Sequence, residues 1–255
     1  MRIARFSHQD AIRYGIVDDL DLVVLDGDPM FAGYDTTGER VPLGDVALLA
    51  PVIPRSKIIA VGRNYRAHAE ELGNEVPAEP LIFLKPPSSL IRSGESIRLP
   101  TVSKRVEYEG EIGVVVGSRL RKASAAEARK AVAGIAAAND VTARDLQKSD
   151  SQWTRAKGFD TFCAVGTVAD PPADLASLTV TTLVNGEVRQ RGKGSEMVFD
   201  IPTILAYISQ VMTLESGDLV LTGTPEGVGT LAPGDVVEVE IAGVSRVSNP
   251  VTSDD

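Results

Sequence analysis

The stretch VEYEGEIGVVVG, residues 106–117, places three glutamates, at 107, 109 and 111, directly before an apolar segment. Residues 112–116 are rich in β-branched side chains and are closed by Gly117, a pattern typical of a largely buried strand. Side chains two residues apart on a strand share a face, so we expect Glu109 and Glu111 to point to the same place. Two carboxylates held that close repel each other unless a positive charge lies between them. The stretch is therefore either a hydrated strand end or one side of a metal site.

Composition limits the class of protein and its partners. The 255 residues, 43% of them hydrophobic, contain no apolar run near the roughly 20 residues that a membrane-spanning helix needs. The start MRIARFSHQD has no apolar signal core, and a single cysteine, Cys163, excludes an internal disulfide. The formal net charge of −9 comes without a basic stripe, which argues against a nucleic-acid partner. We expect a soluble cytoplasmic protein with neither membrane nor nucleic acid as partner.

Short strand-like runs separated by turn residues dominate the chain. Residues 1–54 mix short apolar pieces with turns and predict a small β-rich N-terminal domain, and the two prolines of LLAPVIPRSK predict a link to a larger domain, residues 55–255. Strands are expected at KIIAVG, PLIFLKPP, GIAAANDV and in the tail, and Asn185-Gly186 is a strong hairpin signal.

Three helices are predicted among these strands. They cover residues 64–72, stopped by Gly73, residues 125–133, and a segment capped by Asp200 that runs to about Val211. The chain shows no repeat and no regular alternation of strands and helices. This pattern predicts an α+β fold that is mainly β and mainly antiparallel, with helices packed outside.

A metal site needs a third ligand, and Asp140 is the candidate. It ends the apolar run GIAAAN, so its carboxylate is expected to emerge where a buried strand stops. The alternative is that Asp140 caps a helix over residues 142–146. If it converges with the two glutamates, the ligands are all hard oxygens, which favour Mg²⁺ or Mn²⁺, with Ca²⁺ also suitable, over Zn²⁺.

One histidine and two lysines are candidates for chemistry. His68 has Glu71 three residues later, so on a helix the carboxylate adjoins the imidazole and orients it as a general base; the alternative is a surface histidine in a charged turn. Lys85 and Lys157 lie among apolar or small residues, where an ammonium can bind a substrate carboxylate or simply reach water. The loop LTGTPEGVG can present backbone N–H groups to an anion, but it lacks the ending of a nucleotide-binding P-loop.

Taken in order, the motifs VGRNYRAH, FLKPP, YEGEIGVVVG, NDVTARDLQ, WTRAKGFDTF, VNGEVRQ and LTGTPEGVG resemble the fumarylacetoacetate hydrolase family over residues 57–251. The resemblance implies a mixed β-roll fold, a small preceding domain and a homodimer. It implies that Glu109, Glu111 and Asp140 hold Mg²⁺ or Mn²⁺. It also implies that His68 and Glu71 form a catalytic dyad on a helix that closes over the substrate, and that Lys157 contacts the substrate's oxygens. Substrate-binding positions implied in the same way are Arg63, Tyr65, Lys85, Gln147 and Thr224.

One departure from the family pattern limits the reactions that the resemblance implies. Family members that degrade tyrosine have a further metal-binding aspartate shortly before the catalytic histidine, whereas IIAVGRNYRAH contains no carboxylate. The chain therefore resembles the branch with three carboxylates, in which the metal stabilises an enolate of a 2-oxo acid. We expect a metal-dependent enzyme acting on 2-oxo or 2-hydroxy-enoic acids, as a 2-hydroxyhepta-2,4-diene-1,7-dioate isomerase or an acylpyruvate or fumarylpyruvate hydrolase of aromatic degradation. The alternatives are an oxaloacetate decarboxylase, a sugar-acid dehydratase, and a catalytically idle metal-binding protein with a structural or sensory role.

Overall fold

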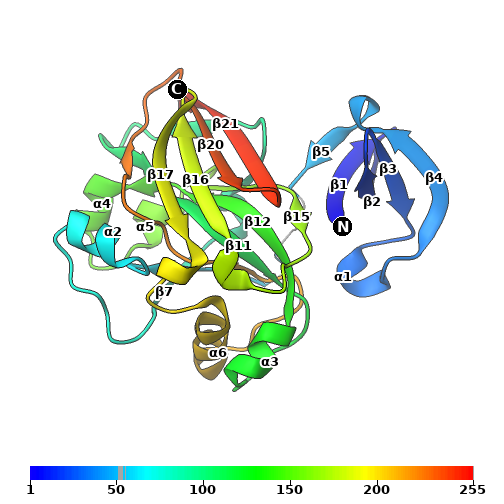
Figure 1. Ribbon diagram of the computed structural model, residues 1–255. Coiled ribbons are helices and arrows are strands. Elements are labelled where there is room, and N and C mark those ends of the chain that lie inside the picture. The colour runs from blue at the N-terminus through cyan, green and yellow to red at the C-terminus, as the bar shows by residue number, and fades with distance from the viewer. Residues whose placement is uncertain (51–53, 55, 255) are drawn as a thin grey trace.

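The computed structural model describes residues 1–50, 54 and 56–254, and strands dominate it (Figure 1). Its helices are α1 (Pro29–Ala32), α2 (Arg66–Glu71), α3 (Ala125–Lys130), α4 (Arg144–Ser149), α5 (Thr154–Lys157) and α6 (Ile201–Val211). Its strands are β1 (Arg2–His8), β2 (Ala11–Asp18), β3 (Asp21–Leu25), β4 (Thr36–Pro42), β5 (Ala47–Leu49), β6 (Ile58–Gly62), β7 (Leu81–Lys85), β8 (Leu90–Arg92), β9 (Ile97–Leu99), β10 (Val106–Tyr108), β11 (Gly110–Val116), β12 (Val132–Asp140), β13 (Thr142–Ala143), β14 (Cys163–Val165), β15 (Val168–Ala169), β16 (Thr179–Val184), β17 (Glu187–Lys193), β18 (Leu219–Leu221), β19 (Gly229–Thr230), β20 (Val236–Ile241) and β21 (Ser245–Ser253). The predicted α+β, mainly β class is confirmed.

Strands β1 to β5 form a lobe beside the main body, drawn in blue in Figure 1. The lobe has a small apolar core of its own, which includes Phe6, Leu22 and Val41. It is joined to the large sheet because β1 pairs with β15 through Arg2 and Ile3. The boundary predicted between residues 54 and 55 falls at a segment, 51–53 and 55, outside the described residues, so the division into two domains stays a prediction.

The main body is built on two packed sheets. The large sheet runs β15-β12-β11-β18-β6-β7 through its centre, and every residue of β11 is buried. The second sheet, in the order β17-β16-β20-β21-β9, packs against β11 and β12. The two sheets come very close at Gly110, where an added Cβ would lie 1.9 Å from Thr182 Oγ1. The glycine between the two glutamates therefore lets the second sheet close over the start of β11.

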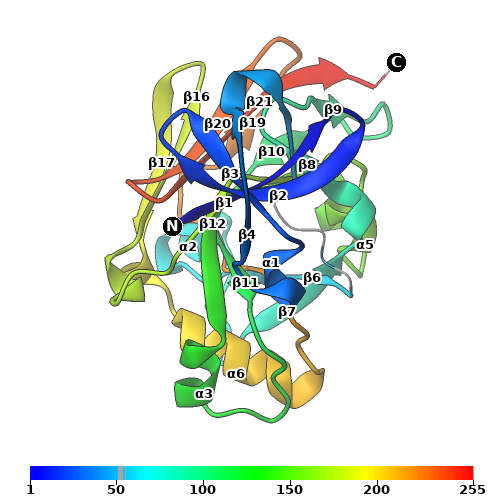
Figure 2. The same cartoon turned by 90° about the vertical axis from the view of Figure 1, so that its right-hand side faces the viewer.

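The helices lie outside the sheets, as the sequence predicts. Asp200 caps α6 by accepting a hydrogen bond from the Thr203 N–H, and the hairpin at Asn185-Gly186 has φ of 53° and 80° at its two turn residues. In Figure 2, α3 and α6 lie together at one end of the molecule, with β9 and β21 at the other end. No helix in the described ranges is long and apolar enough to span a membrane.

Three predicted boundaries were wrong. The helix expected over residues 125–133 ends at Lys130, because the next residues pair with β11 and begin β12. The helix expected from residue 64 begins at Arg66. The single strand expected to carry both glutamates is broken at Glu109, because β10 leaves the large sheet and pairs with β13 and β19.

Candidate metal centre and pocket

Three carboxylates meet where β11 begins and β12 ends. Glu109 lies in the break before β11, Glu111 is the second residue of β11, and Asp140 is the last residue of β12. The antiparallel register places the start of β11 beside the end of β12, and the Asp140 N–H donates to the Glu109 carbonyl oxygen at 2.9 Å. One carboxylate oxygen from each residue lies within 4.8 Å of the others, and all three residues are buried. Asp140 therefore belongs to this cluster, and the alternative of a helix cap was wrong because α4 begins only at Arg144.

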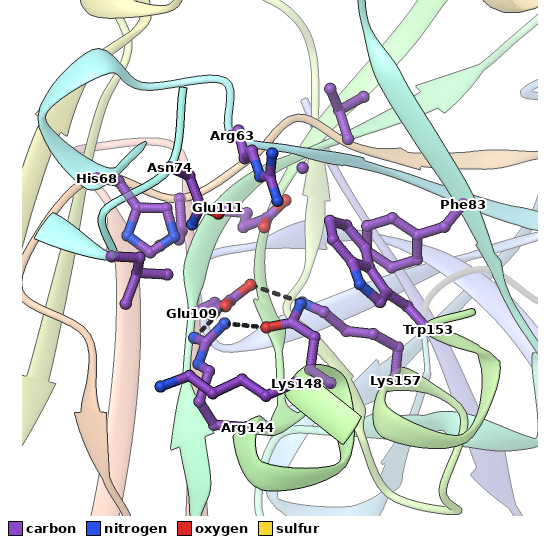
Figure 3. Close-up of a pocket in the computed structure, with 15 residues that line it drawn as sticks. Arg63, His68, Asn74, Phe83, Glu109, Glu111, Arg144, Lys148, Trp153 and Lys157 are labelled. Atoms are coloured by element: carbon purple, nitrogen blue, oxygen red, sulfur yellow. Dashed lines mark hydrogen bonds and ion pairs between the residues drawn. The ribbon is translucent and has the colours of Figure 1, made fainter. Parts of the chain in front are cut away.

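Buried cations surround two of these carboxylates. The Lys157 Nζ lies 2.6 Å from both Glu109 Oε2 and Asp140 Oδ2, so one ammonium bridges two carboxylates. Lys85 Nζ lies 2.7 Å from Asp140 Oδ1 and also donates to the Lys157 carbonyl oxygen. Arg144 donates to Glu109 through one nitrogen and to Glu107 through another, at 2.6 Å from Glu107 Oε2. Figure 3 shows Lys157 and Arg144 converging on Glu109.

Glu111 differs from its two neighbours. Among the described residues, no lysine, arginine or histidine forms an ion pair with it, and Gly223 donates a backbone N–H to its Oε2 at 2.7 Å. Burial, reinforced by the charges of Asp140 and Glu109, raises the pKa of Glu111 well above its usual range. Burial acts in the same direction on Glu109, but Lys157 and Arg144 outweigh it and hold the pKa of Glu109 well below its usual range. The protein's own cations therefore stabilise the ionised form of Glu109 and leave that of Glu111 unfavourable.

A divalent cation fits this cluster. The donor atoms are all carboxylate oxygens, which suit hard cations such as Mg²⁺, Mn²⁺ or Ca²⁺. A cation at this position would stabilise the ionised form of Glu111 and offset its repulsion by Asp140 and Glu109, because like charges this close are costly without a positive charge nearby.

His68 and Glu71 form the pair expected on α2. His68 Nδ1 lies 3.2 Å from Glu71 Oε2, and His68 is only 5% exposed. Glu71 in turn accepts a hydrogen bond from the Gly227 N–H, at 3.1 Å from Oε1. The backbone amides of LTGTPEGVG therefore do meet anions, but these are the carboxylates of Glu111 and Glu71. Because Nδ1 faces Glu71, the other ring nitrogen of His68 is the one available to a ligand.

A pocket of about 210 Å³ opens above the carboxylates. Its described lining includes seven of the predicted site residues: Arg63, His68, Glu109, Glu111, Gln147, Lys157 and Thr224. Arg144, to which the sequence gave no role, also lines the pocket. Gln147 Oε1 accepts from Arg144 at 2.6 Å, and Thr224 Oγ1 donates to the Gly110 carbonyl oxygen at 2.9 Å.

Two predicted substrate-binding residues are placed elsewhere. Tyr65 and Lys85 are not among the described residues that line the pocket. Tyr65 is buried at the start of α2, and Lys85 is buried behind Asp140. Lys85 acts on the carboxylate cluster rather than on the pocket surface.

Sequence reasoning gave no role to several lining residues, namely Asn74, Phe83, Arg144, Lys148 and Trp153. The Phe83 and Trp153 rings meet edge to face at 5.2 Å and form an apolar wall. Trp153 packs so closely on Gly62 that an added Cβ there would lie 2.7 Å from its ring. The signal available was that Phe83, Arg144 and Trp153 lie inside the motifs FLKPP, NDVTARDLQ and WTRAKGFDTF.

Comparison with known proteins places the chain in a family. A sequence profile described as "Fumarylacetoacetate (FAA) hydrolase C-terminal" matches residues 57–252, and one described as "Rv2993c-like, N-terminal" matches residues 1–51. Protein Rv2993c of Mycobacterium tuberculosis is 43% identical over 98% of both chains. The mitochondrial oxaloacetate decarboxylase of Dictyostelium discoideum is 45% identical over 74% of this chain and 89% of its own. The crystal structure of 2-hydroxyhepta-2,4-diene-1,7-dioate isomerase from Mycobacterium marinum matches with a TM-score of 0.90 and 41% identity, over 100% of this chain and 99% of that chain. The chain therefore belongs to the fumarylacetoacetate hydrolase family.

Proposed function

We propose that the protein is a divalent-metal-dependent enzyme that acts on a 2-oxo or 2-hydroxy-enoic acid. The observation that carries this proposal is the buried cluster of Glu109, Glu111 and Asp140, which opens into a pocket beside the His68–Glu71 pair. A cation held by the three carboxylates would supply Lewis-acid polarisation of the substrate's 2-oxo group.

The chain's own residues would handle the proton and the substrate's charge. His68, oriented by Glu71 through Nδ1, offers its other nitrogen to take a proton from the substrate carbon next to the 2-oxo group, or from a water molecule. Lys157 and Arg144 place positive charge at the wall where the substrate's oxygens would gain negative charge. Phe83 and Trp153 keep one side of the pocket apolar and limit the entry of water.

Isomerisation is the reaction we favour, because it needs only proton transfer between positions that one base can reach. The match to the isomerase from Mycobacterium marinum extends over the whole of this chain, including residues 1–51, whereas the oxaloacetate decarboxylase matches 74% of it. Hydrolysis of an acylpyruvate uses the same groups with water as the nucleophile. Decarboxylation of oxaloacetate is the second candidate, supported by the 45% identity to the Dictyostelium enzyme. An idle metal-binding protein is disfavoured, because a buried histidine oriented by Glu71 beside the carboxylates has no use in it.

The test is a substrate screen with controlled metal. Protein treated with a chelator would receive Mg²⁺, Mn²⁺ or Ca²⁺ and then 2-hydroxyhepta-2,4-diene-1,7-dioate, an acylpyruvate or oxaloacetate, with products identified by mass spectrometry. We expect one of them to be converted only when a metal is present. Conversion of none, or equal conversion in chelator, would overturn the proposal. The homodimer and the cytoplasmic location expected from the sequence remain predictions.

A further inference from the structure

Arg63 lines the pocket and has no ion-pair partner in the described part of the chain. Among the described residues, no carboxylate lies within ion-pair distance of its guanidinium, and no side-chain hydrogen bond involves it. The other two cations deep in this wall, Arg144 and Lys157, are both held by Glu109. In Figure 3, Arg63 extends into the pocket from the side opposite Arg144 and Lys148. A half-buried guanidinium left unpaired in a pocket is available to an anion that arrives from solution.

The backbone holds Arg63 in an unfavourable conformation. Its backbone φ is +58°, which lies in the left-handed region that residues other than Gly, Asn and Asp rarely adopt. Such a conformation costs of order 1–3 kcal/mol and persists only where the surroundings enforce it. Of the described non-glycine residues with a positive φ, Arg63 is the one that lines the pocket.

The neighbouring residue supplies that enforcement. Asn64 is fully buried, and its side-chain amide donates to the carbonyl oxygens of Phe199 at 3.0 Å and Thr222 at 2.8 Å. Its side-chain oxygen accepts from the Phe199 N–H at 2.9 Å. Gly223 has no room for a side chain, because a Cβ there would lie 2.7 Å from the Asn64 Cβ. These contacts fix the peptide that follows Arg63 and so fix the direction in which Arg63 leaves the backbone.

We propose that Arg63 binds the second carboxylate of a dicarboxylic substrate and makes the enzyme select dicarboxylic over monocarboxylic 2-oxo acids. The inference rests on the proposed function, which places the 2-oxo-acid end of the substrate at the carboxylate cluster. That end meets Arg144 and Lys157, so the unpaired charge at Arg63 serves the opposite end. An arginine suits this task because its planar fork can bind a carboxylate through two parallel hydrogen bonds.

The test compares ligands that differ only in the terminal group. With Mg²⁺ present, calorimetry would measure binding of 2-oxoglutarate against 2-oxopentanoate, and of 2-oxoadipate against 2-oxohexanoate. We expect the wild type to bind the dicarboxylate of at least one pair about 10- to 100-fold more tightly, the range for a hydrogen bond to a charged group. Arg63→Gln should remove this preference and leave the affinity for the monocarboxylate within about twofold.

Two further variants test whether the effect comes from the charge of Arg63 at its place in the pocket. Arg63→Asn also removes the charge but tolerates a positive φ, so it should behave like Arg63→Gln even if the glutamine variant folds poorly. Arg66→Gln removes the same charge three residues away, on the exposed part of α2 and outside the pocket, and should keep the wild-type preference. Affinity for Mg²⁺ in the absence of ligand should be the same in the Arg63 variants and the wild type.

The outcomes separate this inference from the proposed function. If the wild type binds both members of a pair equally, or if the Arg63 variants keep its preference, Arg63 is not the selecting residue. If the variants lose both ligands equally, or lose Mg²⁺, Arg63 serves the 2-oxo-acid end or neutralises Glu111, and the inference is wrong. If the wild type with Mg²⁺ binds none of the four ligands, the proposed function fails and the inference fails with it.

Discussion

Replacing Lys157 by methionine tests whether its ammonium neutralises the carboxylate cluster. Methionine keeps most of the side chain's volume and removes only the charge. Lys157 is 2% exposed, and its Nζ contacts Glu109 and Asp140 at 2.6 Å each, so both carboxylates lose a buried cationic partner. Removing one member of a buried ion pair costs about 3–5 kcal/mol.

The remaining ion pairs of Glu109 and Asp140 put the expected loss of unfolding free energy at the lower end of that range. Glu109 keeps Arg144 and Asp140 keeps Lys85, so neither carboxylate is left entirely alone. We therefore expect Lys157→Met to lower the free energy of unfolding by about 3 kcal/mol in chelator at pH 8. At about 2–4 °C per kcal/mol for a chain of this size, the melting temperature should fall by about 6–12 °C.

Metal and pH should both reverse this loss. A divalent cation would replace the missing charge, so saturating Mg²⁺ should raise the melting temperature of the variant more than that of the wild type. The pH dependence follows from Glu109, whose pKa Lys157 and Arg144 hold well below its usual range. In the wild type, the resulting stability is present above the unfolded pKa of about 4.3 and is lost as the pH falls further. In Lys157→Met, the carboxyl of Glu109 lacks the Lys157 charge, so its pKa rises. Protonation of Glu109 then relieves its repulsion by the neighbouring carboxylates, and the loss of unfolding free energy should be smaller at pH 5 than at pH 8.

The assay is thermal and denaturant unfolding with and without Mg²⁺, at both pH values. Lys130→Met on exposed α3 is the matched control and should change stability by less than about 0.5 kcal/mol. A Lys157→Met protein within 1 kcal/mol of the wild type in chelator would refute the argument. Equal stabilisation of both proteins by Mg²⁺ would show that the ammonium and the cation do not share a site.

Three further predictions concern the dyad, the sheets and α2. His68→Ala should lower turnover by roughly 10²–10⁴-fold with unchanged Mg²⁺ affinity, whereas Asp140→Ala should weaken both; calorimetry combined with steady-state kinetics distinguishes the two patterns. Gly110→Ala should destabilise the fold by about 1–3 kcal/mol, because its methyl group overlaps the Thr182 hydroxyl, and Thr182→Ala in the same chain should restore part of the loss in denaturant unfolding. Amides of α2 should exchange with solvent faster without than with a substrate analogue, since only His68 and Ala69 of this helix are buried; equal protection in hydrogen exchange would count against closure of α2 over a ligand.

Local patterns in the sequence made the three carboxylates candidates for a cluster but did not indicate which cations neutralise them. Asp140 ends an apolar run, which made it a candidate ligand, but the sequence also allowed a helix cap, and the pairing of β11 with β12 is what brings it to Glu109 and Glu111. The positions of Lys85 and Lys157 do not follow from it. They arrive from β7 and α5, and only the packing of these elements against each other decides that one ammonium bridges two carboxylates while the other lies behind Asp140.

Contacts between distant parts of the chain also explain the wrong helix boundary near residue 130 and the pocket wall at Trp153, which the sequence did not predict. Residues 132 and 133 were expected to continue the helix, but pairing of Val116 with Val132 draws them into β12, because tertiary contacts override a weak local preference. Trp153 shows no periodicity that points to a pocket. Its place depends on Gly62, more than 90 residues earlier in the chain, which leaves room for the indole ring. Contacts of this range have no signature in a local pattern.

The placement of the site residues divides their tasks between rigid and less anchored parts of the fold. Glu109, Glu111 and Asp140 lie on or next to central strands that are almost entirely buried, where local opening costs the most free energy. His68 and Glu71 lie on a helix of six residues that is held to the loop 222–230 through the Gly227 N–H and is otherwise largely exposed. Arg63 stands between these two parts, directly after β6, and Asn64 fixes its peptide to that same loop and to Phe199. A ligand that spans from the carboxylates to Arg63 would therefore contact both the rigid sheet and the base of α2, and its binding would favour the arrangement in which His68 faces the pocket.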